Sequence, residues 1–235
     1  MSPTSREGFL ANVRRSLGRP GFTAPASNGG PTPLSQDATI PQTSNADLKR
    51  LTLRFEEEVK KVHGIVTQVS GREGLSALLG ALIEEKGIRK IVRWDTTALA
   101  AMDPALNDAG AEVVSINLNE NEDARPDLRA ALVGADMGLT EIDYAVADIG
   151  SIVLRASGPQ SRLASVLPPI HVAIVTPDKI VASLAHLLPL LNSSGGLPSA
   201  VSLVTGPSRT ADIETIRTVG IHGPIELHVV IMEES

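Results

Sequence analysis

Hydrophobic positions between residues 46 and 117 alternate between a helical period and short β-forming runs. Residues 46–63 place Leu, Phe and Val at helical spacing around a charged face of Glu and Lys, which predicts an amphipathic helix. The pattern then predicts strands at 64–69, 88–93 and 111–117, a helix at 71–86 and a short helix ending near Gly110. Strands and helices in alternation, joined by short Gly-bearing segments, are typical of right-handed βαβ units in a parallel sheet.

The second half of the chain departs from this alternation. A short helix is expected over 127–133 after Pro126, and β-forming runs on both sides of Asp148-Ile-Gly-Ser151 favour a hairpin or a bulged bend over 144–154. Residues 201–214 predict a strand, a tight turn at Gly206-Pro207 and the start of a helix. The other expected elements are strands at 170–175 and 226–232 and a helix at 177–191. The whole pattern predicts an α/β fold with a mostly parallel sheet.

The first 45 residues predict an appendage ahead of this domain. Apolar residues between Ser5 and Leu17 fall on one helical face, so residues 1–19 are expected to hold a short amphipathic helix. Because so short a helix is marginal alone in water, it is expected to cover its own domain, with a second copy or another protein as alternatives. Residues 20–45, rich in Pro, Gly and Ser, are expected to link this helix to an α/β domain over 46–235.

Composition limits the class of protein and its partners. The 235 residues are 42% hydrophobic but only 2% aromatic, which allows one aliphatic core and offers few rings for stacking bases. A net charge of −6 also argues against a nucleic-acid partner. The N-terminus lacks an apolar signal core and no apolar run reaches membrane-spanning length, so we expect no membrane span and a cytoplasmic location.

The chain contains no cysteine, and this excludes several kinds of chemistry. Disulfides, thiolate zinc sites, a cysteine nucleophile and iron–sulfur clusters held by this chain's own thiolates are all ruled out. No Gly-x-Gly-x-x-Gly follows a strand and no Walker lysine loop is present, so nothing calls for a dinucleotide or ATP. The five histidines include no i, i+4 pair. We therefore expect no cofactor and no metal bound by this chain.

A candidate site for a small anion follows the strand expected at 200–204. Ser208, Arg209, Thr210 and Asp212 leave this strand together, and ligands of open α/β sheets bind beyond the carboxyl ends of strands. Backbone N–H groups at a helix start, with Arg209 beside them, favour an anionic group. The alternative is that these residues only cap the helix while Arg209 pairs with a nearby carboxylate.

Four further residues are candidates for chemistry. His171 lies on an apolar strand and His222 in a Gly-flanked turn, and either imidazole could move a proton. Asp148 and Ser151 flank the expected bend at Gly150, where Asp148 could act as a base or only accept hydrogen bonds. For each histidine the alternative is a structural imidazole, satisfied by hydrogen bonds within the fold.

Four segments together resemble the LUD-domain family, and within it the lactate utilization proteins. The segments are 143–154, 167–175, 205–214 and 220–228, and the most specific run is Gly-Pro-Ser-Arg-Thr-Ala-Asp-Ile-Glu at 206–214. Their order and spacing match, and the N-terminal helix and linker are similar too, so the resemblance covers nearly the whole chain. It implies a three-layer α/β/α domain of the NagB/RpiA/CoA-transferase-like type, whose relatives hold sugar phosphates or CoA esters at strand ends.

The resemblance also implies a role in oxidising L-lactate to pyruvate, together with partner proteins of which at least one carries iron–sulfur clusters. The absence of cysteine agrees with this, since electron transfer would be left to the partners. Asp148 stands where Glu is usual in the family, which shortens a carboxylate arm by one methylene. One alternative is a stand-alone enzyme acting on a CoA ester or a sugar phosphate, in which Asp148 would be the nucleophile of a CoA transferase. The other is a non-catalytic assembly subunit. A homo-oligomer stays possible.

Overall fold

The computed structural model describes residues 44–117, 132–157, 159–193, 198, 200–211, 217–219 and 222–233. The helix expected over residues 1–19, nearly all of the expected linker and most of the helix expected over 127–133 lie outside these described residues. The described domain begins at Ser44, whose side chain accepts a hydrogen bond from the backbone N–H of Asp47 and caps the helix α2 (Asn45–Lys61).

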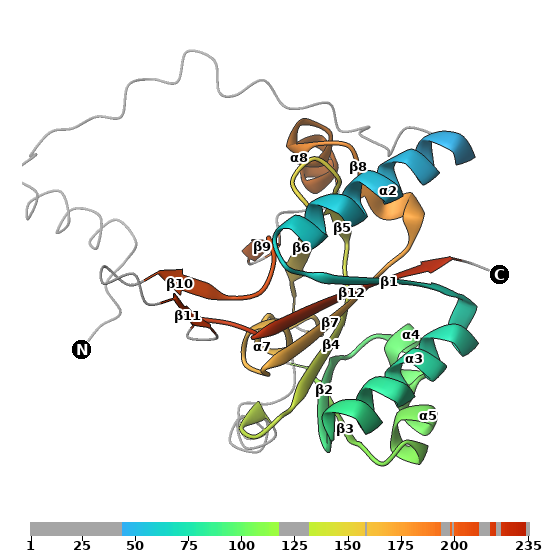
Figure 1. Cartoon of the computed structure of the whole chain (residues 1–235), viewed down its shortest axis with the longest axis vertical. Coiled ribbons are helices and arrows are strands. Elements are labelled where there is room, and N and C mark those ends of the chain that lie inside the picture. The colour runs from blue at the N-terminus through green and yellow to red at the C-terminus, as the bar shows by residue number, and fades with distance from the viewer. Residues whose placement is uncertain are drawn as a thin grey trace, which may run out of the picture. The chain divides into compact units, whose positions relative to one another are not determined.

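A six-stranded sheet, with every strand parallel to its neighbours, forms the centre of the domain (Figure 1). Its order is β1-β12-β7-β4-β2-β3, so segments from both ends of the described chain lie side by side. The strands are β1 (Ile65–Ser70), β2 (Lys90–Trp94), β3 (Glu112–Ile116), β4 (Met137–Glu141), β7 (Ile170–Val175) and β12 (Glu226–Glu233). Such a sheet needs cover on both faces, because its central strands are apolar on both.

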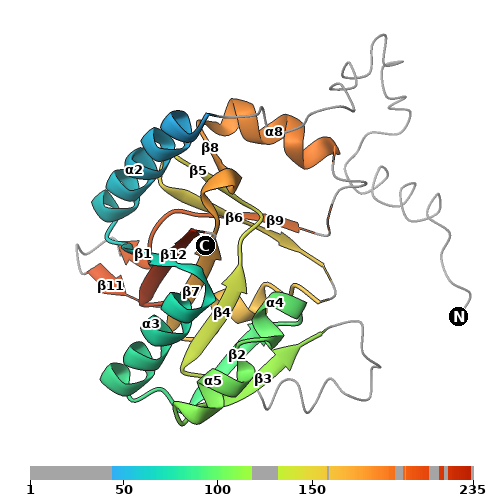
Figure 2. The same cartoon turned by 90° about the vertical axis from the view of Figure 1, so that its right-hand side faces the viewer.

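Helices and a smaller sheet supply this cover. Helix α3 (Gly71–Lys86) packs on β1 and β12, and α5 (Asp103–Asp108) packs on α3 and β3. The short helices α4 (Thr97–Ala100) and α7 (Leu163–Val166) both contact β4. Figure 2 shows α3 and α5 on one side of the large sheet and α2 with the smaller sheet on the other. The expected α/β fold with a mostly parallel sheet is confirmed.

The smaller sheet has four strands in the order β8-β5-β6-β9. Strands β5 (Tyr144–Val146) and β6 (Ser151–Ala156) form the hairpin expected over 144–154, with Gly150 at a positive φ of 59° in the turn. Helix α8 (Leu184–Ser193) packs on this sheet through Leu187 and Leu190, against Val146 and Val153. The remaining members are β8 (Ile180–Val181) and β9 (Ala200–Val204).

The sequence-based predictions of two helices are wrong. Residues 177–191 were expected to be one helix, but Pro177–Lys179 form a 3₁₀ turn (η2), β8 follows, and α8 begins only at Leu184. The β-branched pair in β8 aligns with Ala145 and Val146 of β5, and this non-local pairing outweighs the local helical pattern. The helix expected after Gly206-Pro207 is instead β10 (Arg209–Ala211), antiparallel to β11 (Arg217–Val219).

Strand β4 was not expected from the sequence, although it lies in the centre of the large sheet. Gly138 and Thr140 interrupt its apolar residues and weaken the β signal. The glycine is required because a Cβ at position 138 would lie 1.7 Å from the backbone oxygen of Ala164 in α7. Close approach of a helix to the sheet therefore explains why this strand is hard to recognise.

One histidine is part of the buried core. His171 lies on β7, opposite Gly138 in the parallel register, and none of its surface is exposed. Its Nε2 atom is 2.9 Å from the hydroxyl of Thr140, which is also fully buried. Burial without a compensating charge lowers the pKa of His171 from 6.5 to about 3. The imidazole is therefore neutral at physiological pH.

Replacing Gly138 by alanine is expected to destabilise the fold. The added methyl group collides with the backbone of α7, so the helix must move, and the free energy of unfolding should fall by about 2 to 4 kcal/mol. Gly80→Ala in α3 is the matched control, because a Cβ there meets nothing within 4 Å, and it should stabilise by about 0.5 to 1 kcal/mol. Denaturant unfolding measures both changes, and equal stability of the two variants would contradict the tight packing at Gly138.

His171 is expected to make stability depend on pH in the acid range. Its pKa is lower in the folded state, so the unfolded chain binds a proton first as the pH falls below about 6.5, and stability is lost from there toward pH 3. The free energy of unfolding should fall by about 1.4 kcal/mol per pH unit through this imidazole alone. His171→Gln should flatten that slope, whereas His186→Gln, at an exposed position, should leave it unchanged. Parallel pH profiles for wild type and His171→Gln would refute this role.

Candidate functional site

The connections of β2 and β4 diverge at the carboxyl edge of the large sheet. The two strands are neighbours, yet the chain leaving β2 passes through α4 and α5 to β3, whereas the chain leaving β4 enters the small sheet and returns at β7. Ligands of open α/β sheets bind in the crevice that such a divergence creates. This edge is therefore the first place to look for a site.

A small cavity lies at this edge, with a volume of about 50 Å³. Two of its lining residues are charged, Arg72 in the first turn of α3 and Glu141 at the end of β4. The rest of the lining is apolar and comes from α3, α4, β7, β12 and the residue before α5: Leu75, Ala98, Leu99, Met102, Ile174 and Met232. The cavity thus combines one cation, one carboxylate and a hydrophobic floor.

Neighbouring residues fix the position of Glu141. Its Oε2 atom accepts a hydrogen bond of 2.5 Å from the hydroxyl of Thr96, in the loop that follows β2. The same hydroxyl accepts a hydrogen bond from the backbone N–H of Leu99 and so caps α4. One side chain therefore joins the two diverging loops of the crevice.

A buried ion pair holds the far side of the crevice. Arg93 on β2 donates from Nε and Nη2 to the two carboxylate oxygens of Asp103, at 2.7 and 2.6 Å, and from Nη1 to the backbone oxygen of Trp94. Such a bidentate pair fixes both position and direction. All of these donors are engaged within the fold, so Arg93 serves to anchor α5 to the sheet.

Asp143 follows β4 on the side of the small sheet. Its Oδ2 atom accepts a hydrogen bond from the backbone N–H of Arg155, and the Arg155 Nε atom lies 3.9 Å from its Oδ1 atom. Burial raises the pKa of the Asp143 carboxyl, while the contacts with Arg155 oppose this shift. Paired with Arg155 in this way, Asp143 joins the end of β4 to β6.

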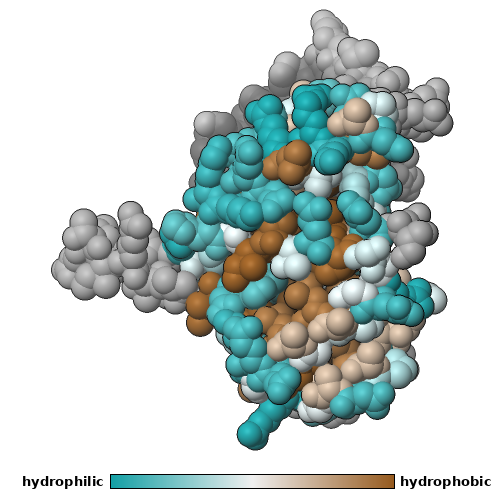
Figure 3. Space-filling view, turned by 45° about the vertical axis from the view of Figure 1, so that its right-hand side comes forward, coloured by the Kyte–Doolittle hydropathy of each residue, from teal (hydrophilic) through white to brown (hydrophobic). Residues whose placement is uncertain are grey.

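A larger cavity of about 820 Å³ lies farther along the same edge, at the ends of β1, β12 and β7 and beside α2. Its charged lining residues are Lys49, Asp178 and Glu233. The hydroxyl of Thr52 faces no hydrogen-bond partner within the described part of the chain, although it is buried. Leu53 also lines this cavity and is half exposed, and Figure 3 shows hydrophobic side chains reaching the surface within a hydrophilic border.

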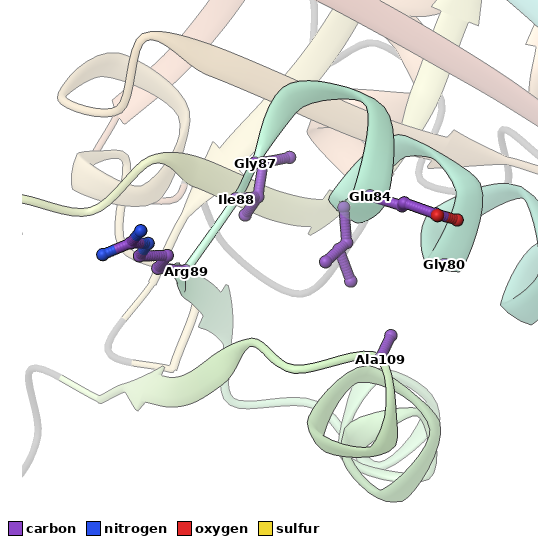
Figure 4. A pocket seen from close by; sticks show the side chains of 7 residues that line it. Gly80, Glu84, Gly87, Ile88, Arg89 and Ala109 are labelled. Atoms are coloured by element: carbon purple, nitrogen blue, oxygen red, sulfur yellow. The ribbon is translucent and has the colours of Figure 1, made fainter.

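A third cavity, of about 470 Å³, lies between the end of α3 and the start of β2, with Ala109 beyond α5 completing it (Figure 4). It contains Arg89 and Glu84, but their side chains lie on opposite sides and point away from each other in Figure 4. Gly87, which ends α3 at a positive φ of 64°, shapes its wall. These two charged groups do not converge on one ligand position.

The structure brings some of the residues predicted from sequence into pairs. The Ser208 hydroxyl accepts a hydrogen bond of 3.3 Å from the backbone N–H of His222, and the N–H of Ser208 donates to the backbone oxygen of Pro224. The Ser151 hydroxyl is 2.6 Å from that of Thr205 and is fully buried. Both serines therefore join loops, and the side chains of His222 and Arg209 are exposed.

The other predicted residues lie apart from these pairs. Asp148 forms an ion pair of 3.0 Å with Arg54 of α2, and His171 is enclosed in the core beside Thr140. Thr210 lies on β10, but the structure describes only its backbone. Asp212 lies outside the described residues. An anion-binding role for Arg209 stays a prediction, now placed on a two-stranded ribbon in place of a helix start.

Arg72, Thr96 and Glu141 were not predicted from sequence. Glu141 was missed because β4 was missed, and Arg72 belongs to a helix whose pattern gave no hint of a site. One signal was present: Asp95 and Thr96 come two and three residues after the end of the strand expected at 88–93. Among the described residues, no group of three potential metal ligands occurs. No helix in the described ranges is long and apolar enough to cross a membrane.

Comparison with known proteins identifies relatives along nearly the whole chain. Lactate utilization protein C of Shouchella clausii is 27% identical over 238 residues, covering 98% of this chain and 99% of that protein. Lactate utilization protein C of Halalkalibacterium halodurans is 30% identical over 239 residues, covering 97% and 98%. The uncharacterized protein YkgG of Escherichia coli (strain K12) is 30% identical over 247 residues, covering 98% and 99%.

Fold comparison and a family model agree with these relatives. A crystal structure of a DUF162 family protein from Deinococcus radiodurans matches with a TM-score of 0.53 at 23% identity, covering 79% of this chain and 98% of that one, and shows a similar fold. The model of the LUD domain matches residues 53–232, which include every strand of the large sheet apart from the last residue of β12. This chain therefore belongs to the LUD domain family.

Proposed function

We propose that this protein is a component of an L-lactate utilization system and supports the oxidation of L-lactate to pyruvate together with iron–sulfur partner proteins. The observation that carries this proposal is the similarity to lactate utilization protein C of two bacteria, which extends over at least 97% of each chain. A match from end to end includes both the sheet and the loops that surround its carboxyl edge.

The composition of the chain supports the division of work in this proposal. Oxidation of L-lactate to pyruvate releases two electrons and two protons, and these electrons need an acceptor. The chain has no cysteine with which to hold an iron–sulfur cluster. On this proposal the protein binds a small anion at strand ends, and partner proteins take the electrons.

Deleting the gene is expected to abolish growth of the host on L-lactate as carbon source while leaving growth on pyruvate normal. Pyruvate is the product of the proposed oxidation, so it bypasses the missing step. A plasmid copy of the full chain should restore growth on L-lactate, and growth curves on the two carbon sources measure the effect. Unchanged growth of the deletion strain on L-lactate would disprove the proposed function.

A tagged chain is expected to retain iron–sulfur proteins when it is purified from cells grown on L-lactate. With L-lactate as electron donor, the purified chain alone should not reduce an artificial electron acceptor, whereas the co-purified assembly should reduce it. Iron and acid-labile sulfide content, together with acceptor reduction, are the measurements, and a purification from cells without the tag is the control. Turnover by the isolated chain at the rate of the assembly would favour a stand-alone enzyme instead.

A further inference from the structure

We infer that the cavity between Arg72 and Glu141 is the binding site for a short 2-hydroxy carboxylate, with L-lactate as its ligand in the proposed system. This inference rests on the proposed function for the choice of ligand. The residues and their roles come from the cavity itself.

The size of the cavity selects a small ligand. Each water-sized group needs about 10 to 15 Å³ of such volume, so a cavity of about 50 Å³ accepts only a few heavy atoms. Lactate, with six heavy atoms, fills such a cavity and extends to its open edge at the exposed Arg72 and Ala98, whereas a CoA ester or a sugar phosphate exceeds it several-fold. The cavity therefore favours lactate over a CoA ester or a sugar phosphate as ligand.

The lining offers a partner for each group of lactate. Arg72 supplies a guanidinium for the carboxylate, and Arg–carboxylate pairs are among the stronger polar contacts in proteins. Glu141 supplies a carboxylate oxygen to accept a hydrogen bond from the hydroxyl. Within the described part of the chain its hydrogen bond from Thr96 goes to Oε2, so Oε1 is left for a ligand. Leu99, Met102 and Met232 supply apolar surface for the methyl group.

Charge distinguishes this cavity from the larger one at the same edge. The cavity of about 820 Å³ is lined by Asp178 and Glu233 against the single cation Lys49, so a carboxylate ligand meets a net negative lining there. In the smaller cavity Arg72 balances Glu141, and the ligand carboxylate adds one charge to a neutral pair. The protein as a whole carries a net charge of −6, so an anion depends on such a local cation.

Thr96 acts as a positioning residue in this arrangement. Its hydroxyl holds Glu141 and also caps α4, which supplies Leu99 to the cavity floor. Divergence of the chain after β2 and β4 opens the crevice, and Thr96 bridges it. The carboxylate that meets the ligand hydroxyl is thus held by the opposite wall of the same crevice.

The test is a ligand-observed NMR titration of the purified full chain with L-lactate, D-lactate and propionate. Wild-type protein should transfer saturation to the methyl group of L-lactate with a dissociation constant in the range of about 0.1 to 10 mM, as expected for so small a ligand. Propionate, which lacks the hydroxyl, should bind several-fold more weakly, and D-lactate should also bind more weakly because three contacts at one carbon distinguish its mirror images. Absence of L-lactate binding at about 10 mM, or equal binding of all three acids, would overturn the inference.

Variants locate the site. Arg72→Ala should weaken L-lactate binding about tenfold or more, with partial recovery in Arg72→Lys. Glu141→Gln should weaken binding of L-lactate several-fold but leave propionate unchanged, a difference that a purely structural role would not produce. Arg89→Ala and Glu84→Gln, at the cavity of about 470 Å³, are matched controls and should bind as wild type does.

Two outcomes contradict the assignment while leaving the proposed function intact. Wild-type affinity in Arg72→Ala would exclude this cavity, and loss of binding in Arg209→Ala with full binding in Arg72→Ala would place the anion at the start of β10. The growth test of the gene deletion is independent of both. If the deletion strain fails to grow on L-lactate but the Arg72→Ala protein binds L-lactate normally, only the assignment of the site is refuted.

Discussion

The structure depends on the close approach between α7 and β4 at Gly138. A Cβ at this position would lie 1.7 Å from a backbone oxygen of α7, so only glycine lets this helix cover the centre of the sheet. The same strand carries Thr140, which meets the buried His171 of β7, and it ends at Glu141 in the crevice. Packing of α7 on one face of β4 thus fixes the position of this strand. The end of the same strand supplies Glu141, the carboxylate of the candidate site.

The same packing sets the protonation state of His171. An imidazole with a depressed pKa, no exposed surface and a hydroxyl partner remains neutral across the physiological range. In this position its Nε2 atom meets Thr140 and its ring fills space opposite Gly138, while its Nδ1 atom has no hydrogen-bond partner among the described residues. A role of His171 in moving a proton stays a prediction. Glu141, three residues after Gly138, leaves the packed region and reaches a cavity, so its carboxylate is available to a ligand.

Much of the fold could be predicted from sequence because its elements carry local signals. The strands at β1, β2, β3, β7 and β12 are aliphatic runs, and α3 matches its expected limits of 71–86. Failures occur where a distant partner decides the outcome: Ile180 and Val181 become a strand by pairing with β5, and Arg209 to Ala211 by pairing with β11. The residues of the candidate sites show the same difference. Ser208 and His222 were predicted from sequence and are joined by a hydrogen bond. Arg72 and Glu141 were not predicted, because they line one cavity only after α3 and β4 have packed together in the fold.

The position of the small cavity also fits the proposed division of work, in which this chain binds the ligand and partner proteins take the electrons. Arg72 and Ala98 are exposed at its edge, so a ligand bound there lies close to the surface and not deep in the core. Electron transfer requires proximity, and a chain without cysteine relies on an acceptor brought by another protein or a diffusible molecule. A substrate held at the surface by one cation and one carboxylate can meet such an acceptor without opening the fold. On the proposed function, the packed centre of the sheet around the fully buried His171 stays closed while the ligand binds.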